Sequence, residues 1–251
     1  MKNDLIQFTP NVQSTNILLS EMVNHSVQEG TCIPQFFALY TDFQTNGRGM
    51  GDNRWFSEKG KNLLVSFYFR PDIPASSQFL FNQYFATATR QFISRFANNV
   101  LIKWPNDIYV NGKKLAGDLT IHSLAGNHIK HTIAGIGINL NQDWFPQEIP
   151  HPTSLFLETG GKFDVRHFLE DYQQFLIQQF DRIYREPKVL QEEYLEHLFQ
   201  FGEPHNYIIF GEQKRATIRG IDAFGRLQLE DGNGRTCTCG FKEVGFIMDN
   251  E

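Results

Sequence analysis

A glycine-rich loop is the first part of the chain whose residue types could bind an anion. Residues 47–51 have the sequence Gly-Arg-Gly-Met-Gly, and Trp55 follows shortly after. Glycines at alternate positions free backbone N–H groups to wrap an anion, and the Arg48 guanidinium adds a planar positive fork. The segment lacks the Gly-Lys-Ser of a P-loop and precedes a predicted strand, which disfavours both a P-loop and a Rossmann fingerprint. By itself it fits a flexible loop equally well.

Two segments with lysines follow, and a tight turn folds them together. Residues 103–108 have the sequence Lys-Trp-Pro-Asn-Asp-Ile, and residues 114–117 have the sequence Lys-Leu-Ala-Gly. Asn111 and Gly112 between them tolerate positive φ, so they predict a two-residue hairpin turn. An isolated lysine is usually a solvated surface residue. Lys114, however, directly precedes small residues beside which a ligand could approach the backbone closely.

A third segment ends in two amides, and a polar triplet begins the first predicted helix. Residues 135–141 have the sequence Gly-Ile-Gly-Ile-Asn-Leu-Asn, which alone could be a buried strand that closes into a turn. Its glycines allow a close approach to the strand. Near the N-terminus, Ser14 is a plausible N-cap ahead of Thr15 and Asn16.

Hydrophobic periodicity predicts the elements that must position these segments. Helices are expected at 14–24, 76–97 and 164–185, with a shorter one to about 201, and strands at 32–42, 63–69, 100–110, 114–122 and 129–139. After Gly202 we expect short strands between glycine-containing turns, at 207–210, 215–218, 226–229, 236–239 and 243–247. This dense spacing predicts a small β-barrel. We therefore predict an α+β protein with domains at 1–201 and 202–251.

Composition excludes several classes of protein. The chain has 251 residues, of which 41% are hydrophobic and 20% charged, as in folded proteins of one or two domains. It contains no run of about 18 apolar residues, and its start lacks an apolar signal core, so we expect neither a membrane span nor secretion. The net charge is −5, so the chain lacks the overall basic charge that is typical of nucleic-acid-binding proteins.

Cysteines and histidines predict neither a disulfide framework nor a metal site. Three cysteines cannot pair completely, which indicates a reducing cytoplasm. Cys237 and Cys239 are too few ligands for zinc, and in a strand both thiols would point the same way. No cysteine or carboxylate joins His122, His128 and His131. We expect no direct protein cage for a metal ion.

Together and in this order, the polar triplet and the three segments resemble the biotin protein ligase family. The resemblance covers most of residues 10–141, and the strand-rich tail resembles the SH3-like C-terminal domain of that family. It implies a mixed β-sheet with helices, as in class II aminoacyl-tRNA synthetase/biotin synthetase-like catalytic domains. It also implies a two-step reaction. Biotin and Mg-ATP form biotinoyl-5′-AMP, and the acyl group passes to a lysine of a biotin carboxyl carrier domain, as in acetyl-CoA carboxylase.

The resemblance also implies a role for each matching residue. Lys114 and Arg48 are the expected catalytic residues, because they would neutralise the repulsion between the biotin carboxylate and the α-phosphate. Biotin contacts are expected from Ser14, Thr15, Asn16, Gln44, Gly47, Arg48, Gly49, Lys114 and Gly117. Nucleotide contacts are expected from Arg48, Trp55, Lys103, Asn106, Asp107 and Asn139. Mg²⁺ would enter with ATP, and the expected partners include no nucleic acid and no membrane.

Two positions depart from the family pattern, and two other functions stay open. Met50 replaces an arginine of the loop, and Asp118 replaces an apolar residue. A lipoate or octanoate protein ligase would share the catalytic fold, but the intact 103–108 segment and glycine loop favour biotin. A non-catalytic biotin sensor would not need Lys114 with Arg48. About a dozen residues precede Ser14, too few for a winged-helix DNA-binding domain, so we expect a monofunctional ligase.

Overall fold

A seven-stranded mixed sheet forms the centre of the computed structural model, which describes residues 5–51 and 53–248. Its strand order is β1-β2-β3-β7-β6-β5-β4. The strands are β1 (Ile6–Val12), β2 (Ala38–Gln44), β3 (Leu63–Phe69), β4 (Val100–Lys103), β5 (Asp107–Val110), β6 (Lys113–Ala125) and β7 (His128–Ile138). β1 and β2 are parallel, and the other neighbouring pairs are antiparallel.

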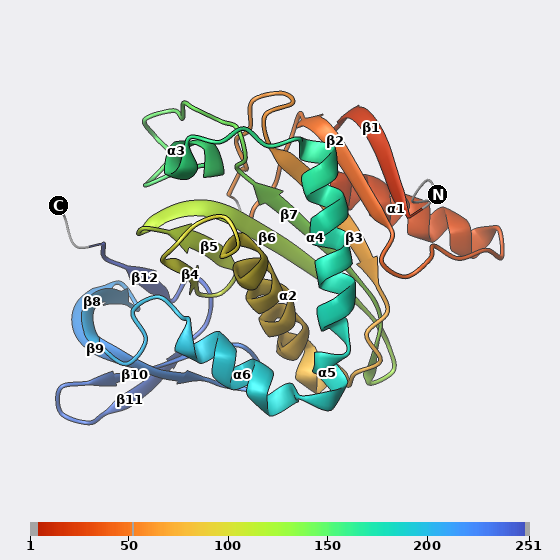
Figure 1. Ribbon diagram of the computed structural model, residues 1–251. Helices are drawn as coiled ribbons and strands as arrows, with labels where there is room; N and C mark the ends of the chain where they lie inside the picture. Colours follow the sequence, from red (N-terminus) through yellow and green to blue (C-terminus); the bar gives the residue numbers. More distant parts are fainter. Residues whose placement is uncertain (1–4, 52, 249–251) are drawn as a thin grey trace.

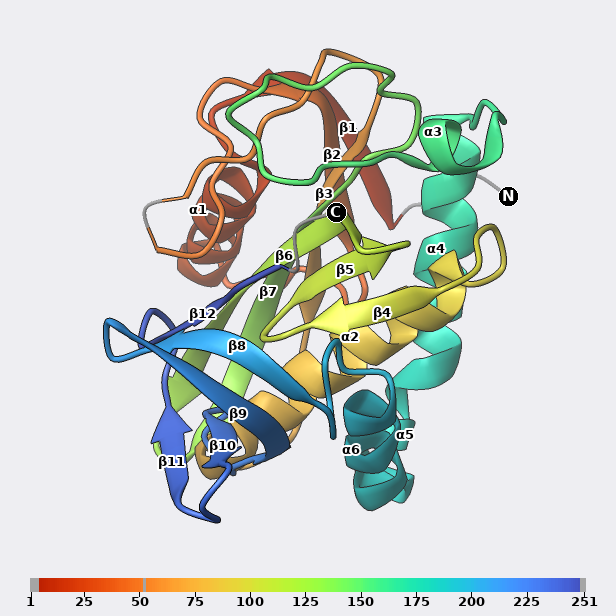
Figure 2. The same ribbon diagram turned by 90° about the vertical axis from the view of Figure 1, so that its left-hand side faces the viewer.

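Helices cover both faces of this sheet (Figure 1). Helix α1 (Thr15–Gln28) packs on one face, where Leu19 and Val23 are buried with Leu39 and Ile133. The opposite face carries α2 (Gln78–Ile93), α4 (Val165–Phe180), α5 (Arg182–Arg185) and α6 (Pro187–Glu196), as Figure 2 shows. Two short helices, η1 (Ala75–Ser77) and α3 (Leu155–Thr159), lie in the connections. Because both faces are covered, all seven residues of β3 are buried.

Phenylalanine rings fill the space between the sheet and α2. Phe67 and Phe69 of β3 meet Phe81 and Phe85 of α2, with ring centroids 5.1–6.3 Å apart for the contacting pairs. All three pairs are edge-to-face, an arrangement that adds to the stabilisation from apolar burial. The sequence contains 24 phenylalanines, and these four belong to the main apolar cluster of the protein.

A second, five-stranded antiparallel sheet follows residue 203. Its strands, in the order β11-β10-β9-β8-β12, are β8 (Pro204–Ile209), β9 (Glu212–Ile221), β10 (Leu227–Asp231), β11 (Thr236–Cys239) and β12 (Val244–Phe246). Buried residues of this sheet, such as Tyr207 and Ile218, belong to the same apolar cluster as the large sheet. The SH3-like form of this part and the boundary at Gly202 stay predictions.

The α+β class and most expected elements are confirmed, although several bounds differ. The helix expected at 164–185 is divided at Asp181 into α4 and α5. The strand expected at 32–42 begins only at Ala38. β1 was not predicted, because Pro10 interrupts the short alternation of Ile6, Phe8 and Val12. The expected 100–110 strand is wrong as one strand, since Trp104, Pro105 and Asn106 turn the chain so that β4 pairs with β5. Helix α2 ends at Ile93, four residues before the expected end at 97. No described helix is long and apolar enough to cross a membrane.

Candidate active site

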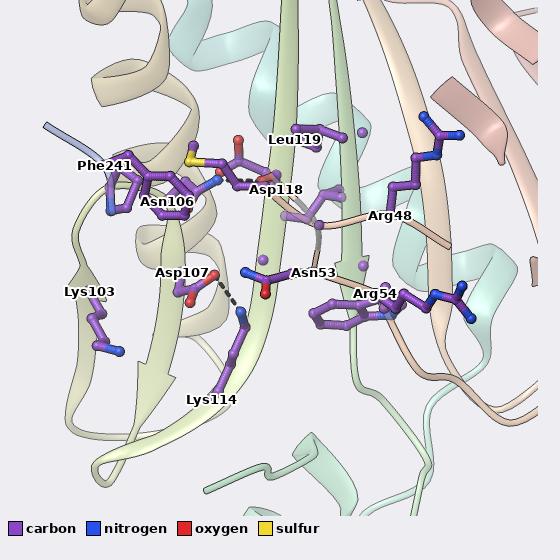
Figure 3. A pocket seen from close by; sticks show the side chains of 18 of the residues that line it. Arg48, Asn53, Arg54, Lys103, Asn106, Asp107, Lys114, Asp118, Leu119 and Phe241 are labelled. Atoms are coloured by element: carbon purple, nitrogen blue, oxygen red, sulfur yellow. Dashed lines mark hydrogen bonds and ion pairs between the residues drawn. The ribbon is translucent and has the colours of Figure 1, made fainter. Parts of the chain in front are cut away.

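A cavity of about 270 Å³ opens where both sheets meet the glycine loop (Figure 3). Twelve of the predicted site residues line it: Ser14, Thr15, Asn16, Gln44, Arg48, Gly49, Trp55, Lys103, Asn106, Asp107, Lys114 and Gly117. The C-terminal sheet and the turn before β12 add Phe241, Val244, Gly245 and Phe246, which were not predicted. The structure therefore brings segments from the whole chain to one site.

One end of the cavity carries a network of hydroxyl and amide groups around the start of α1. Gln44 Oε1 accepts a 2.8 Å hydrogen bond from the Thr15 backbone N–H. Ser66 Oγ lies 2.7 Å from Thr15 Oγ1 and 2.6 Å from Asn16 Oδ1, and Asn16 Nδ2 donates to the Leu119 carbonyl at 2.9 Å. Ser66 is fully buried, and its signal in the sequence was a lone hydroxyl within an otherwise apolar strand. Sequence reasoning missed it.

Ser14 is the N-cap residue of α1, as expected, and its carbonyl accepts the first helical bond from the Leu18 N–H at 3.0 Å. Its side chain makes no capping hydrogen bond, and the residue is buried at the cavity. The Ser14 hydroxyl is therefore placed to meet a ligand rather than the first helical turn.

Glycines of β7 let two side chains of the site approach the sheet. A β-carbon at Gly135 would stand 2.6 Å from Asn16 Cγ, and one at Gly137 would stand 2.6 Å from Trp55 Nε1. Real β-carbons do not approach heavy atoms this closely, so each glycine admits a neighbouring side chain. The close approach predicted from the sequence is thus used by Asn16 and Trp55 themselves.

Trp55 presents a buried donor toward the site. Its indole Nε1 is buried without a hydrogen-bond partner in the described part of the chain. Buried polar atoms are normally paired, so an unpaired one at a cavity wall points to a ligand atom. The Lys114 ammonium lies 5.8 Å from the centroid of the same ring.

Lys114 and Asp107 form an ion pair in the middle of the site. Their Nζ and Oδ1 atoms are 2.7 Å apart, and their side chains are 31% and 22% exposed. The hairpin predicted at Asn111-Gly112 pairs Asp107 with Gly117, whose missing side chain leaves room for the carboxylate. The Lys114 backbone is held by the His151 carbonyl, to which its N–H donates at 2.7 Å.

The 103–107 segment ties several elements together. The Trp104 indole N–H donates to the Gly225 carbonyl at 2.9 Å, which links the segment to the turn between β9 and β10. Asn106 donates from its amide to the backbone carbonyl of Asp118 in the neighbouring strand. These bonds fix the backbone on either side of the cavity, so the segment has a structural role beside any contact with ligands.

The glycine loop folds back on itself and holds two arginines side by side. The Gly49 N–H donates to the Asn53 carbonyl at 2.8 Å, and Arg48 stands opposite Arg54 in an antiparallel bridge. Both arginine side chains are exposed, and in Figure 3 their guanidinium groups extend away from the Lys114–Asp107 pair. Met50 lines the cavity. Arg54 also lines the cavity and is the second arginine of this region.

Two predicted residues, Gly47 and Asn139, are not brought to the cavity wall. Asn139 is buried, and its side-chain Nδ2 donates to the Thr153 carbonyl at 2.9 Å. Gly47 accepts a backbone bond from the Trp55 N–H at 3.0 Å, which closes the glycine loop. Their parts in ligand binding stay predictions.

Asp118 is a buried carboxyl group in β6, the strand that carries Lys114, and it also lines the cavity. It is 6% exposed, and Thr120 Oγ1 donates to its Oδ2 at 3.0 Å. Burial, which disfavours the charged form, raises its pKa to about 8 despite the Thr120 hydrogen bond. Asp118 is therefore mostly neutral at neutral pH, which is why it can replace an apolar residue here.

Comparison with known proteins agrees with this arrangement. Residues 10–139 match the model of the Biotin/lipoate A/B protein ligase family. This chain belongs to that family. It is 37% identical to the Bifunctional ligase/repressor BirA of Bacillus spizizenii over 166 residues. The match covers 63% of this chain and 49% of that relative, so the chain spans about half of the relative's length. It is 36% identical over 78 residues to the Biotin–[acetyl-CoA-carboxylase] ligase of Paracoccus denitrificans, covering 30% of this chain and 32% of that protein.

Among solved structures, the fold is similar to that of a Biotin protein ligase from Aquifex aeolicus in complex with biotin and ATP. The TM-score is 0.72, the sequences are 22% identical, and the match covers 98% of each chain. The five-stranded C-terminal sheet is therefore part of the shared architecture.

Proposed function

We propose that the chain activates biotin with Mg-ATP and transfers it to one lysine of a biotin carboxyl carrier domain in the cytoplasm. The observation that carries the proposal is the position of the Lys114–Asp107 pair in the same cavity as the Thr15–Gln44–Asn16 network. A cationic centre beside an uncharged hydroxyl and amide network suits a ligand with a neutral ring and a carboxylate. The relatives named above as a ligase and as an acetyl-CoA-carboxylase ligase support this choice.

The network at the start of α1 would bind the ureido ring. Neutral hydroxyl and amide groups such as Ser14 and Thr15 can exchange hydrogen bonds with a urea without burying a charge. Ser66 and Leu119 hold Asn16 in one orientation, so little ordering remains when the ligand binds. This half of the cavity discriminates ligands by hydrogen bonding, which rejects analogues that lack the matching groups.

Lys114 would act where the two anionic substrates meet. A biotin carboxylate oxygen attacks the α-phosphorus, a P–O bond forms, and the bond to pyrophosphate breaks. The ammonium has three donors, and Asp107 accepts one, which leaves two for the carboxylate and the phosphate. A preorganised positive charge at this point stabilises the transition state more than the separated substrates.

Asn106, Asp107 and Trp55 would face the nucleotide. Mg²⁺ enters as part of the Mg-ATP substrate, and Asp107 offers a carboxylate at the cavity wall for it. In the second step the neutral amine of the carrier lysine attacks the acyl carbon and an amide bond forms. AMP leaves with the bonding pair of the C–O bond, and the proton lost by the amine passes to solvent. A glycine loop that closes over the adenylate would protect it from water.

The deciding experiment is pyrophosphate exchange with biotin and lipoate in parallel. We expect exchange with biotin to exceed exchange with lipoate by at least about 10²-fold, because the polar network matches only the urea. Faster exchange with lipoate would assign the chain to the lipoate branch. Tight biotin binding without any exchange would identify a sensor instead of an enzyme.

The alternating glycines of β7 provide a prediction about biotin affinity. Gly135→Ala should raise the KM for biotin by about 10- to 100-fold, since the new methyl group displaces Asn16 by a fraction of an ångström or more. The KM for ATP should change much less. Gly232→Ala is the matched control, because a β-carbon there meets nothing within 4 Å and the residue lies in a distant turn. An unchanged KM for biotin would remove Asn16 from the binding site.

A further inference from the structure

Lys103 lies between two aromatic rings rather than free in the cavity. Its Nζ atom is 5.1 Å from the ring centroid of Tyr109 and 5.1 Å from that of Phe246, and it donates to the Tyr109 hydroxyl at 3.2 Å. Tyr109 is in β5, two residues along the strand from Asp107, the partner of Lys103, whereas Phe246 belongs to β12 of the second sheet. The cation therefore bridges the two sheets.

The rings around Lys103 contact one another as well. Phe246 meets Tyr207 edge-to-face at 5.4 Å and lies 6.4 Å from Phe199, which in turn lies 5.8 Å from Tyr109. Tyr207 is fully buried. We call these four rings the Lys103 cage. A cation against ring faces gains electrostatic attraction, and the gain grows as water is removed.

Partial burial makes this contact important for the lysine. Burial lowers the pKa of Lys103, and the nearby Asp107 carboxylate partly opposes that effect. An ammonium in such a place needs compensation for lost hydration, and the Tyr109 hydroxyl and two ring faces supply it. Figure 3 shows the Lys103 side chain apart from the Lys114–Asp107 pair.

The position of β12 matters for the cavity. Val244, Gly245 and Phe246, which make up the strand, all line it. β12 is an edge strand with only three residues paired to β8, so its own ladder holds it weakly. Both ribbon views place β12 beside the β4–β6 part of the large sheet (Figure 1, Figure 2).

We propose that Lys103 is a positioning residue that anchors Phe246, and through it β12, as a wall of the nucleotide half of the cavity. It does so through the Lys103 cage and does not itself bind phosphate. The kinetic consequence rests on the proposed function, whereas the contact between the two sheets does not. Lys103 thus connects the segment that carries Asp107 to the C-terminal sheet.

A double-mutant cycle in urea unfolding tests the contact without any substrate. Lys103→Met keeps most of the side-chain volume but removes the charge, and Phe246→Leu removes the ring. We expect the double variant to be clearly more stable than the sum of the two losses predicts, because both remove one contact. The control is Lys103→Met with Phe224→Leu, an exposed ring outside the cage, and there the losses should add. Additive losses with Phe246 would overturn the proposal.

Kinetics then separate positioning from direct phosphate binding. Lys103→Met and Phe246→Leu should each raise the KM for ATP by about three- to tenfold in pyrophosphate exchange, with kcat changed by less than about twofold. The KM for ATP of the double variant should exceed that of the more impaired single variant by no more than about twofold. Lys103→Arg should keep the KM for ATP close to that of the wild type, since arginine also packs on ring faces.

Two results would overturn the role of Lys103. One is a normal KM for ATP in Phe246→Leu together with a raised KM in Lys103→Met. The other is a double variant whose KM rises by the product of the single effects, as expected for an independent phosphate contact. If the wild type shows no exchange with biotin, the proposed function fails, and the unfolding cycle still decides whether Lys103 couples the two sheets.

Discussion

Lys114→Ala will lower the rate of biotin-dependent pyrophosphate exchange by about 10²–10³, the size expected for losing one preorganised charge at a transition state. The loss should fall mainly on kcat, because the charge between carboxylate and phosphate matters most as the bond forms. Folding should be little affected, since the ion pair with Asp107 is partly exposed and such pairs contribute about 1 kcal/mol or less.

The neighbouring lysine offers a matched control for this variant. Lys113 precedes it in β6 and is exposed, so Lys113→Ala removes the same charge from the chain without touching the cavity. It should leave exchange unchanged. The two purified variants should first be shown to have equal unfolding midpoints. The rate of pyrophosphate exchange is then measured for each variant and for the wild type. Normal exchange in Lys114→Ala would take this residue out of the catalytic centre.

Asp118→Asn will make the chain more stable than the wild type at neutral and alkaline pH, with a gain that depends on pH. The carboxyl pKa is raised from 3.8 to about 8 by burial, so the folded state keeps a proton that the unfolded state releases. Between these two values the wild type loses up to about 1.4 kcal/mol of unfolding free energy per pH unit as pH rises. Above pH about 8 the loss is complete and the curve is flat.

Asparagine has the same shape as aspartic acid but no ionisable proton. The Asp118→Asn variant should therefore not lose unfolding free energy in this way as pH rises. The stability difference between variant and wild type should grow from about pH 4 to about pH 8 and then stay constant. Urea unfolding at intervals across this range measures it. Asp171→Asn, at an exposed position of α4, is the control and should show no such growth. If the unfolding free energies of Asp118→Asn and the wild type changed with pH in parallel, the carboxyl group would have to be solvated or paired.

Local chemistry in the sequence was enough to predict that the two lysine-containing segments at the centre of the site fold together. Asn111 and Gly112 specify a hairpin by their own backbone preferences. Within it Lys114 lies opposite Tyr109 and Asp107 opposite Gly117, and the Lys114 side chain reaches the Asp107 carboxylate. The apolar run of β3 and the periodic helices likewise follow from short-range patterns. The glycines of β7 predicted a close approach without saying of what, and the side chains that make this approach are those of Asn16 and Trp55.

What only the tertiary structure decided involves residues far apart in the chain. Ser66 acquires its place behind Thr15 and Asn16 because α1 packs on β3, a contact without a local signature. Phe246 reaches the cavity because the second sheet docks on the β4–β5 hairpin. Short-range preferences set the type of each element and the partners across a tight turn, but the choice of packing partner depends on which distant apolar faces bury one another. The sequence alone therefore determined the motifs and their chemistry, whereas the docking of distant elements decided the cage around Lys103.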